Sequence, residues 1–306
     1  MLNTQRLKIL REVEARGTIT AAAEALYLTP PAVSHQLATL EREVGVPLLI
    51  RAARSVRLTD AGHLLAQRAG IILAECESAL AEVASFSEEV SGSVRISVFQ
   101  TAAQSIALPA FAALTKRYSR LELLVKGLEP ARALPALRAG QLDIALSHEW
   151  DLVPVESDPN MDRYDLLTEP AVVLLPLGHP LAGKPVHLRD LAQERWCVAQ
   201  ETASSRQAVE RVAQQAGFQP KVMFESDYFR AIGAAVEVGL GVGIAPLMTD
   251  LRGLDISIQP LVEPKMSRRI FAAVRAGSGG SPTIRAVLDA LQVAADDLHL
   301  NDDSRR

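Results

Sequence analysis

TPPAVSHQLATLEREVGVPLL, the stretch from Thr29 to Leu49, contains the start and the stop of one short helix. Thr29 can cap the free amide groups of the first turn, and a proline at the first helical position loses no hydrogen bond there. Gly45 supplies the left-handed backbone conformation that ends many helices. The buried stripe of this helix has spacings of three and four and consists of Val33, Leu37, Leu40 and Val44. The opposite face is small and polar, so it can approach the base edges in a DNA groove.

The residues around this helix predict a winged helix-turn-helix domain over residues 1–60. A first helix is expected over residues 3–15 and a second over 20–26, with a turn at 27–28. Residues 49–58 then predict two short strands around a polar tip, which form the wing. A helix-turn-helix with a wing is the simplest arrangement that accounts for all of these segments.

The composition is that of a folded protein with room for two or three domains. The chain has 306 residues, of which 48% are hydrophobic. No apolar run approaches the roughly 20 residues needed to cross a bilayer, and the charged N-terminus lacks the core of a secretion signal. The two cysteines, Cys76 and Cys197, lie far apart and form neither a metal motif nor a disulfide framework. We therefore expect a cytoplasmic protein that needs no metal or cofactor and has no contact with a membrane.

The net charge of −4 is unevenly distributed along the chain. Residues 1–62 hold eight Lys or Arg and six Asp or Glu, which gives +2, whereas the remaining residues carry −6. A mildly basic N-terminal segment joined to an acidic remainder is typical of a small DNA-reading domain attached to a larger domain with another function.

Residues 61–92 are predicted to form a long linker helix that ends at a Ser-Gly-Ser hinge. Thr59 and Asp60 cap this helix, and its pattern continues to about Glu89. Apolar or small residues alternate at spacings of four and three, which is the pattern of a coiled-coil seam. The residues expected in this seam are Leu65, Ala69, Ile72, Cys76 and Val83. A second copy of the chain would cover the seam; the alternative is a helix packed on its own domain.

Residues 93–306 alternate between strand and helix patterns, which predicts α/β sheets. The strands and helices fall into two groups, so we expect two lobes with a cleft between them. Lobe I is expected to contain residues 93–165 and 267–306, and lobe II residues 166–266. The whole chain is therefore predicted to be an α+β multidomain protein.

Five segments together resemble the LysR-type transcriptional regulators, in the right order along the chain. They are Thr18–Leu26, Pro31–Ser34, Leu40–Arg51, Val56–Gly62 and Gly239–Pro246. The resemblance implies a winged helix-turn-helix, a dimerising linker helix and a two-lobed effector-binding domain similar to periplasmic binding proteins. It also implies a homotetramer, a dimer of dimers, on an interrupted palindrome of double-stranded DNA.

The groove-facing helix departs from the family pattern at two positions. Most members have glutamine where this chain has Pro30, and often arginine where it has His35. Glutamine and arginine can each make two hydrogen bonds to one base. Proline makes only van der Waals contact with a base, and histidine makes one hydrogen bond. We expect base readout here to depend on shape and apolar contact. Leu49 and Ile50 replace an aromatic and acidic pair of the wing, which should change its packing.

The candidate DNA contacts come from the second helix, the groove-facing helix and the wing. They are Thr20, Pro30, Pro31, Ser34, His35, Thr39, Arg51, Arg54 and Arg57. Arg54, at the wing tip, is the strongest candidate for a phosphate contact, and phosphate contacts position a protein without reading the sequence. The alternative for each arginine is a solvated surface charge, and for His35 an ordinary surface histidine. About three phosphate contacts per protomer predict a log–log salt slope near −5 for a dimer.

The candidate effector contacts lie where strands end and helices begin, because free amide groups collect there. They are Gln100, Thr101, His148, Thr202, Ser204, Phe229 and Pro246. Ser204 also has Gln207 three residues on, so the alternative for Ser204 is a capping box. No Arg or Lys is expected at these strand ends, which disfavours a highly charged anionic effector.

The patterns for catalysis are weak. Gly239, Gly241 and Gly243 follow a helix instead of a strand and have the wrong spacing for a dinucleotide loop. No two histidines have metal-ligand spacing, no serine lies in a nucleophile elbow, and Cys197 lies in an apolar strand that favours a packed thiol over a redox switch. We therefore expect a sequence-specific DNA-binding transcriptional regulator, modulated by a small-molecule effector, and no enzyme activity. The alternative is a small-molecule-binding or catalytic α/β protein whose N-terminal module binds another protein.

Overall fold

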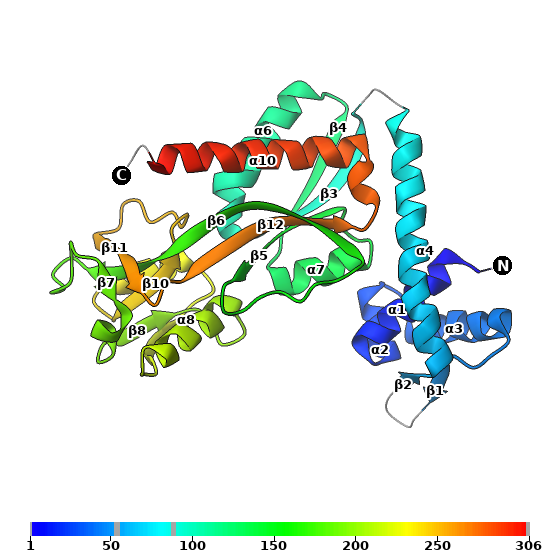
Figure 1. Ribbon diagram of the computed structural model, residues 1–306, viewed down its shortest axis with the longest axis horizontal. Coiled ribbons are helices and arrows are strands. Elements are labelled where there is room, and N and C mark those ends of the chain that lie inside the picture. Colours follow the sequence, from blue (N-terminus) through cyan, green and yellow to red (C-terminus); the bar gives the residue numbers. More distant parts are fainter. Residues whose placement is uncertain (1, 52–55, 87–89, 304–306) are drawn as a thin grey trace.

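The computed structural model describes residues 2–51, 56–86 and 90–303. It arranges them as a winged helix domain, a long helix and two lobes that follow one another along the long axis (Figure 1). No helix among the described residues is long and apolar enough to cross a membrane.

The winged helix domain contains three helices and a two-stranded antiparallel wing. The elements are α1 (Thr4–Arg16), α2 (Ile19–Ala25), α3 (Pro30–Val44), β1 (Leu49–Arg51) and β2 (Val56–Leu58). The side chain of Thr29 accepts a hydrogen bond from the amide of Ala32, and Gly45 adopts φ +76° after the last turn of α3. Thr18, and not Thr20, caps the second helix by accepting from the amide of Ala21 at 3.1 Å, so α2 begins one residue earlier than expected.

The core of this domain is built from one apolar stripe of each helix and the start of the wing. Its fully buried members include Leu7, Leu10, Val13, Ala22, Val33, Leu40 and Leu48. Glu41 connects α3 to the wing, because its carboxylate accepts the amides of Leu48 and Leu49 at 2.8 and 3.1 Å. The position of α3 relative to the wing is therefore held by hydrogen bonds as well as by packing.

The linker helix α4 (Asp60–Ser85) packs on its own domain in its first half and leaves its second half exposed. Ala69 is fully buried against that domain, and Leu65 and Ile72 are half-buried against the same core. The predicted seam is therefore wrong at Ala69, because α1 of the same chain already packs on this side of α4. Cys76 is exposed, and Val83 is 70% exposed.

Lobe I contains five strands in the order β4-β3-β5-β12-β6. These are β3 (Gly92–Val98), β4 (Leu121–Gly127), β5 (Ile144–Trp150), the first part of β6 (Met161–Pro176) and β12 (Ser267–Arg275). One face of this sheet packs on α5 (Gln100–Ala102), η1 (Ala103–Ala107), α6 (Leu108–Arg117) and α10 (Pro282–Asp303). The other face packs on α7 (Pro130–Arg138). A 3-10 turn, η3 (Ser278–Gly280), lies before α10 and contacts α4.

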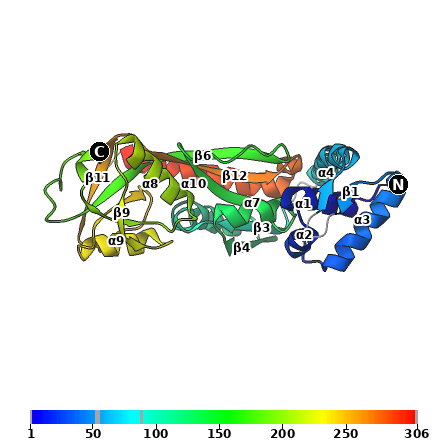
Figure 2. The same ribbon diagram turned by 90° about the horizontal axis from the view of Figure 1, so that it is seen from below.

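Lobe II continues the same sheet through the second part of β6, followed by β10, β8 and β9. Its strands are β7 (Val186–His187), β8 (Arg195–Val198), β9 (Lys221–Glu225), β10 (Val242–Pro246) and β11 (Ile256–Glu263), with a 3-10 turn η2 (Leu188–Leu191). Helices α8 (Ser204–Gln215) and α9 (Phe229–Glu237) cover opposite faces. Figure 2 shows α8 and α9 on the two sides of this sheet.

Strand β6 is the covalent and hydrogen-bonded link between the lobes. It is 16 residues long and pairs with β12 up to Pro170 and with β10 from Ala171 onward. The pattern of residues 171–175 predicts only its second part, since the first part alternates polar and apolar side chains and resembles a loop. Because one strand belongs to both sheets, the residues near 170 lie where the two lobes meet.

Candidate nucleic-acid interface and lobe junction

The exposed face of α3 presents the residues that the sequence predicts for a DNA groove. Pro30, Pro31 and His35 are exposed, and Ser34 is partly exposed. Helix α3 lies at the end of the molecule away from the two lobes, so this face is not covered by the rest of the chain (Figure 2). Thr39 is partly buried, and its hydroxyl donates to the carbonyl of His35 at 2.9 Å and accepts from Arg42 at 2.8 Å.

The remaining candidates for DNA contact belong to α2 and the wing. Thr20 is exposed on α2. Arg57 is exposed on β2, and Arg51 belongs to β1, paired with Val56. Arg54 lies outside the described residues. Three elements of one small domain thus carry the groove-facing and phosphate-facing candidates.

A buried ion pair that the sequence analysis missed lies where the two lobes meet. Arg268 of β12 and Glu169 of β6 are 1% and 4% exposed, and both the Nε and the Nη2 of Arg268 donate to the Oε1 of Glu169, the former at 2.9 Å. Arg268 also donates to the hydroxyl of Thr101 at 2.8 Å, and Glu169 accepts the amide of Met248 at 2.7 Å. The pair therefore joins the start of the first lobe I helix to the chain that follows β10.

The expectation of no arginine at this edge is wrong, and the reason is strand register. The pattern of residues 270–276 predicts the apolar part of β12, but the strand begins at Ser267. Its antiparallel register places Arg268 opposite Trp150 on one side and Glu169 on the other. An isolated sequence shows neither partner strand, so it could not place Arg268 at the site. Its charge is balanced by Glu169.

Gln100, Thr101 and His148 come together on the lobe I side of this junction. The rings of His148 and Phe99 meet edge to face with centroids 4.7 Å apart, and the Nε2 of His148 lies 4.0 Å from the carboxylate of Glu129. Glu129 also accepts a hydrogen bond from the amide of Gln100. The start of α5 after β3, the residue before α7 after β4 and the last part of β5 therefore converge, as the sequence predicts for the carboxyl edge of parallel strands.

The electrostatics of this cluster follow from its burial. Burial lowers the pKa of His148 well below its usual range, and the nearby charge of Arg268 lowers it further, so the ring is neutral. Burial also raises the pKa of Glu129, while Arg268 and the amide of Gln100 act in the opposite direction. Among the described residues, the Nδ1 of His148 and the indole N–H of Trp150 are buried without a hydrogen-bond partner. A ligand that reaches these groups would satisfy polar atoms that are otherwise unpaired.

The predicted effector contacts in lobe II are more dispersed. Thr202 is exposed in a turn, Phe229 begins α9 and packs on the core beneath it, and Pro246 ends β10 two residues before Met248. Ser204 begins α8, whose cap is Ala203 and which has no side-chain cap bond, so the capping-box alternative is wrong. No hydrogen bond or ion pair within the described ranges joins Thr202, Ser204 or Phe229 to the His148 cluster.

Neither a metal site nor a reactive Cys197 thiol is supported in the part of the chain that the structure describes. No group of three or more His, Cys, Asp or Glu residues there could hold a metal ion. Cys197 is fully buried in β8, and this burial raises the pKa of its thiol to about 11. Such a thiol stays protonated, as expected for a packed core cysteine.

Comparison with known proteins agrees with this architecture over most of the chain. The family model "Bacterial regulatory helix-turn-helix protein, lysR family" matches residues 4–63, and the "LysR substrate binding domain" matches residues 87–296. The Probable HTH-type transcriptional regulator LrrA of Synechococcus elongatus is 30% identical, over 96% of this chain and 98% of its own.

Two further relatives show the same breadth of match. The Nitrogen assimilation regulatory protein nac of Escherichia coli is 29% identical, over 95% of this chain and 94% of its own. The solved structure of full-length OxyR from Pseudomonas aeruginosa has a TM-score of 0.65 at 21% identity and covers 96% of this chain and 95% of that one, which is a likeness of fold. On this evidence the chain belongs to the LysR family and is a DNA-binding transcriptional regulator with an effector-binding domain.

Proposed function

We propose that this regulator reads its operator with α3 and the wing, and that a small molecule bound at the lobe junction controls it. The observation that carries the first part is the exposed face of α3 with Pro30, Pro31 and His35. Since neither proline donates a hydrogen bond, this face favours contact with groove shape and thymine methyl groups. Arg51, Arg54 and Arg57 would hold the phosphates on either side.

The proposed effector site is the lobe junction around Thr101 and His148. The support is a set of buried polar groups without partners beside a charge-balanced pair, Arg268 and Glu169. A neutral histidine and a hydroxyl favour a ligand with hydrogen-bonding groups over a highly charged one. Because β6 runs through this junction and β12 begins at it, a ligand that prefers one lobe arrangement would shift the population of that arrangement. We propose that the protein works by such binding in the cytoplasm, without catalysis.

A second copy of the chain is the proposed partner of the linker helix. Leu80 and Val83 in its second half, and Phe86 directly after it, are exposed apolar side chains, at 68%, 70% and 92% exposure. Leaving side chains of this size in water is unfavourable, and a symmetric copy would bury them. A dimer of dimers would then offer several winged helix domains to one operator.

The DNA-binding part is tested with genomic fragments that co-purify with the full-length chain. In gel-shift titrations at several salt concentrations, Arg57→Ala should weaken binding to all fragments and reduce the salt slope by about 2 for a dimer. His35→Ala should instead change the order of preference among fragments. Lys184→Ala is the control, because Lys184 is exposed in lobe II, far from the winged helix. Unchanged binding in both variants would contradict the assignment of α3 and the wing.

A further inference from the structure

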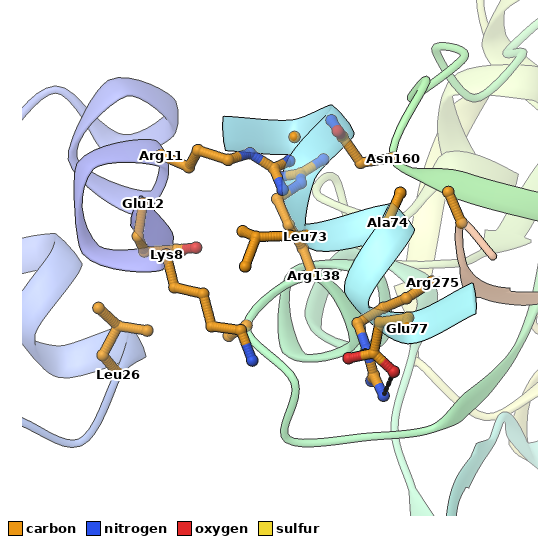
Figure 3. Close-up of a pocket in the computed structure, with 13 residues that line it drawn as sticks. Lys8, Arg11, Glu12, Leu26, Leu73, Ala74, Glu77, Arg138, Asn160 and Arg275 are labelled. Carbon is orange, nitrogen blue, oxygen red and sulfur yellow. Dashed lines mark hydrogen bonds and ion pairs between the residues drawn. The ribbon is translucent and has the colours of Figure 1, made fainter. Parts of the chain in front are cut away.

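A pocket lies between the winged helix domain and lobe I, at the end of lobe I that faces away from lobe II. Its walls come from α1, from the middle of α4, from the last turn of α7 and from residues beside β6 and β12 (Figure 3). The domains approach each other closely here. A β-carbon placed on Gly70 of α4 would lie 2.3 Å from the side-chain oxygen of Asn160.

Four cationic side chains line this pocket, and two of them are neutralised. Arg275 contacts the carboxylates of Glu77 at 3.2 Å and Asp143 at 3.3 Å. Arg138 contacts Asp158 at 2.8 Å. The pocket's other carboxylate, Glu12, is almost fully buried and is paired with Arg16 of the same helix.

The other two cations, Lys8 and Arg11 of α1, have no hydrogen bond or ion pair with any residue that the structure describes. Both side chains are partly buried. The guanidinium carbon of Arg11 lies 3.8 Å from the position of a β-carbon on Gly70, and the Nζ of Lys8 lies 4.0 Å from the equivalent position on Gly140, just after α7. Lys8 therefore reaches toward lobe I, and Arg11 extends from α1 along α4 into the pocket, as Figure 3 shows.

The environment of Arg11 is unfavourable for an unpaired charge. Burial lowers its pKa, and the nearby guanidinium of Arg138 adds to this effect, while Asp158 and the glutamates of α1 oppose it. Removing a charge from water without a partner costs free energy, and an anion at hydrogen-bonding distance would offset that cost. An arginine fork and an ammonium group are a suitable pair of donors for a small oxyanion.

We propose that this pocket binds a small oxyanion, such as inorganic phosphate or a carboxylate, between Lys8 and Arg11 on one side and the Arg138 region of lobe I on the other. The site is distinct from the lobe junction and belongs to a different domain boundary. A bound anion would be shared by both domains, so it would favour the arrangement in which the winged helix domain rests on lobe I. This would give the regulator a second small-molecule input that acts on the position of the DNA-binding domain.

The test uses the full-length chain without DNA and compares sodium phosphate with sodium chloride at equal ionic strength. We expect phosphate to raise the thermal midpoint by about 2–4 °C above chloride. The rise should be lost in the double variant Lys8→Gln/Arg11→Gln and retained in Lys184→Gln, which removes one exposed lysine of lobe II. The same experiment with acetate shows whether a single carboxylate is sufficient.

Hydrogen exchange on the wild-type chain provides a readout that does not depend on a variant. Phosphate should slow amide exchange in both α1 and α7, because the anion joins the two helices. An equal midpoint shift in all variants, or protection confined to other elements, would overturn the proposal. A third outcome would also overturn it: phosphate has no effect without DNA, and the double variant loses only DNA affinity. The pocket's cations would then serve DNA phosphates.

Discussion

The two domain boundaries of this molecule differ in how their charged side chains are paired. At the lobe junction, one arginine and one glutamate are almost fully buried and paired with each other; Arg268 also donates to the hydroxyl of Thr101, and Glu169 accepts the amide of Met248. At the boundary between the winged helix domain and lobe I, Lys8 and Arg11 are partly buried and have no hydrogen bond or ion pair with a residue that the structure describes. The first boundary is also crossed by one continuous strand, β6, and the second by none of the described strands.

The difference indicates two separate mechanical roles. A matched buried pair on continuous strands strongly resists separation, since breaking it leaves an uncompensated charge in the interior. A partly hydrated boundary with unmatched cations can be rearranged by small energies, including those of an added ion. The two lobes are therefore joined firmly, whereas the winged helix domain is attached to lobe I by contacts that smaller energies can rearrange.

The largest expected effect comes from breaking the matched pair. Arg268→Met should lower the free energy of unfolding by about 3–5 kcal/mol, because Glu169 would remain buried without its partner. Glu77→Gln, at the other boundary, should cost less than about 1 kcal/mol, because its pair with Arg275 is partly hydrated. Denaturant unfolding of the full-length chain measures both.

The double variant Arg268→Met/Glu169→Leu is the control for this comparison. It removes both charges, so it should recover most of the loss of the single variant. Equal losses for Arg268→Met and Glu77→Gln would contradict the distinction between the two boundaries.

A medium effect is expected where the linker helix meets lobe I. Gly277 has φ +83°, and a β-carbon there would lie 2.5 Å from the backbone oxygen of Ala74 in α4. Gly277→Ala should therefore cost about 1–3 kcal/mol and loosen α4 from lobe I, because a helix backbone cannot move aside as a side chain can. Thermal unfolding and protease cleavage of α4 measure the two consequences.

Gly217→Ala provides a matched control for the backbone strain. Gly217 has φ +87° but nothing within 4 Å of its β-carbon position. Gly217→Ala should therefore lower the free energy of unfolding by about 1 kcal/mol, from backbone strain alone. If both variants unfold at the same midpoint, the close approach of Gly277 to α4 is unimportant.

The smallest effect is a pH dependence at the lobe junction. His148 has a folded pKa well below its usual value, so below about pH 6.5 the unfolded chain takes up a proton that the folded chain does not. The free energy of unfolding should fall by about 1 kcal/mol more between pH 7 and 5.5 in the wild type than in His148→Gln. Parallel pH profiles for the two proteins would show that His148 is not held neutral by burial.

The sequence predicted the local structure of the winged helix domain well because its signals are local. Thr29, Gly45 and the stripe from Val33 to Val44 place the ends and the buried face of α3 within a residue or two. The parallel strands of the lobes are likewise found from short apolar runs, and with them the convergence of Thr101 and His148. The family resemblance, which the comparisons confirm, adds the domain order.

Contacts between distant segments were not predictable in this way. The linker-helix pattern is the same whether its apolar side chains meet a partner or α1 of the same chain, so Ala69 was assigned to the wrong side. The polar first part of β6 forms a strand only because β12 lies beside it. Lys8, Arg11 and Arg138 belong to helices more than a hundred residues apart, and only the folded chain brings them to one pocket.

By itself, the sequence determined the elements, their order and the DNA-reading helix, because caps, stops and apolar spacing act over a few residues. Only the tertiary structure decided which charges are matched. Antiparallel register set Arg268 against Glu169, and the docking of α1 on lobe I left Lys8 and Arg11 without a hydrogen bond or ion pair to any residue that the structure describes. The physical reason is that a charge depends on what surrounds it in space, and those surroundings come from segments far apart in the chain.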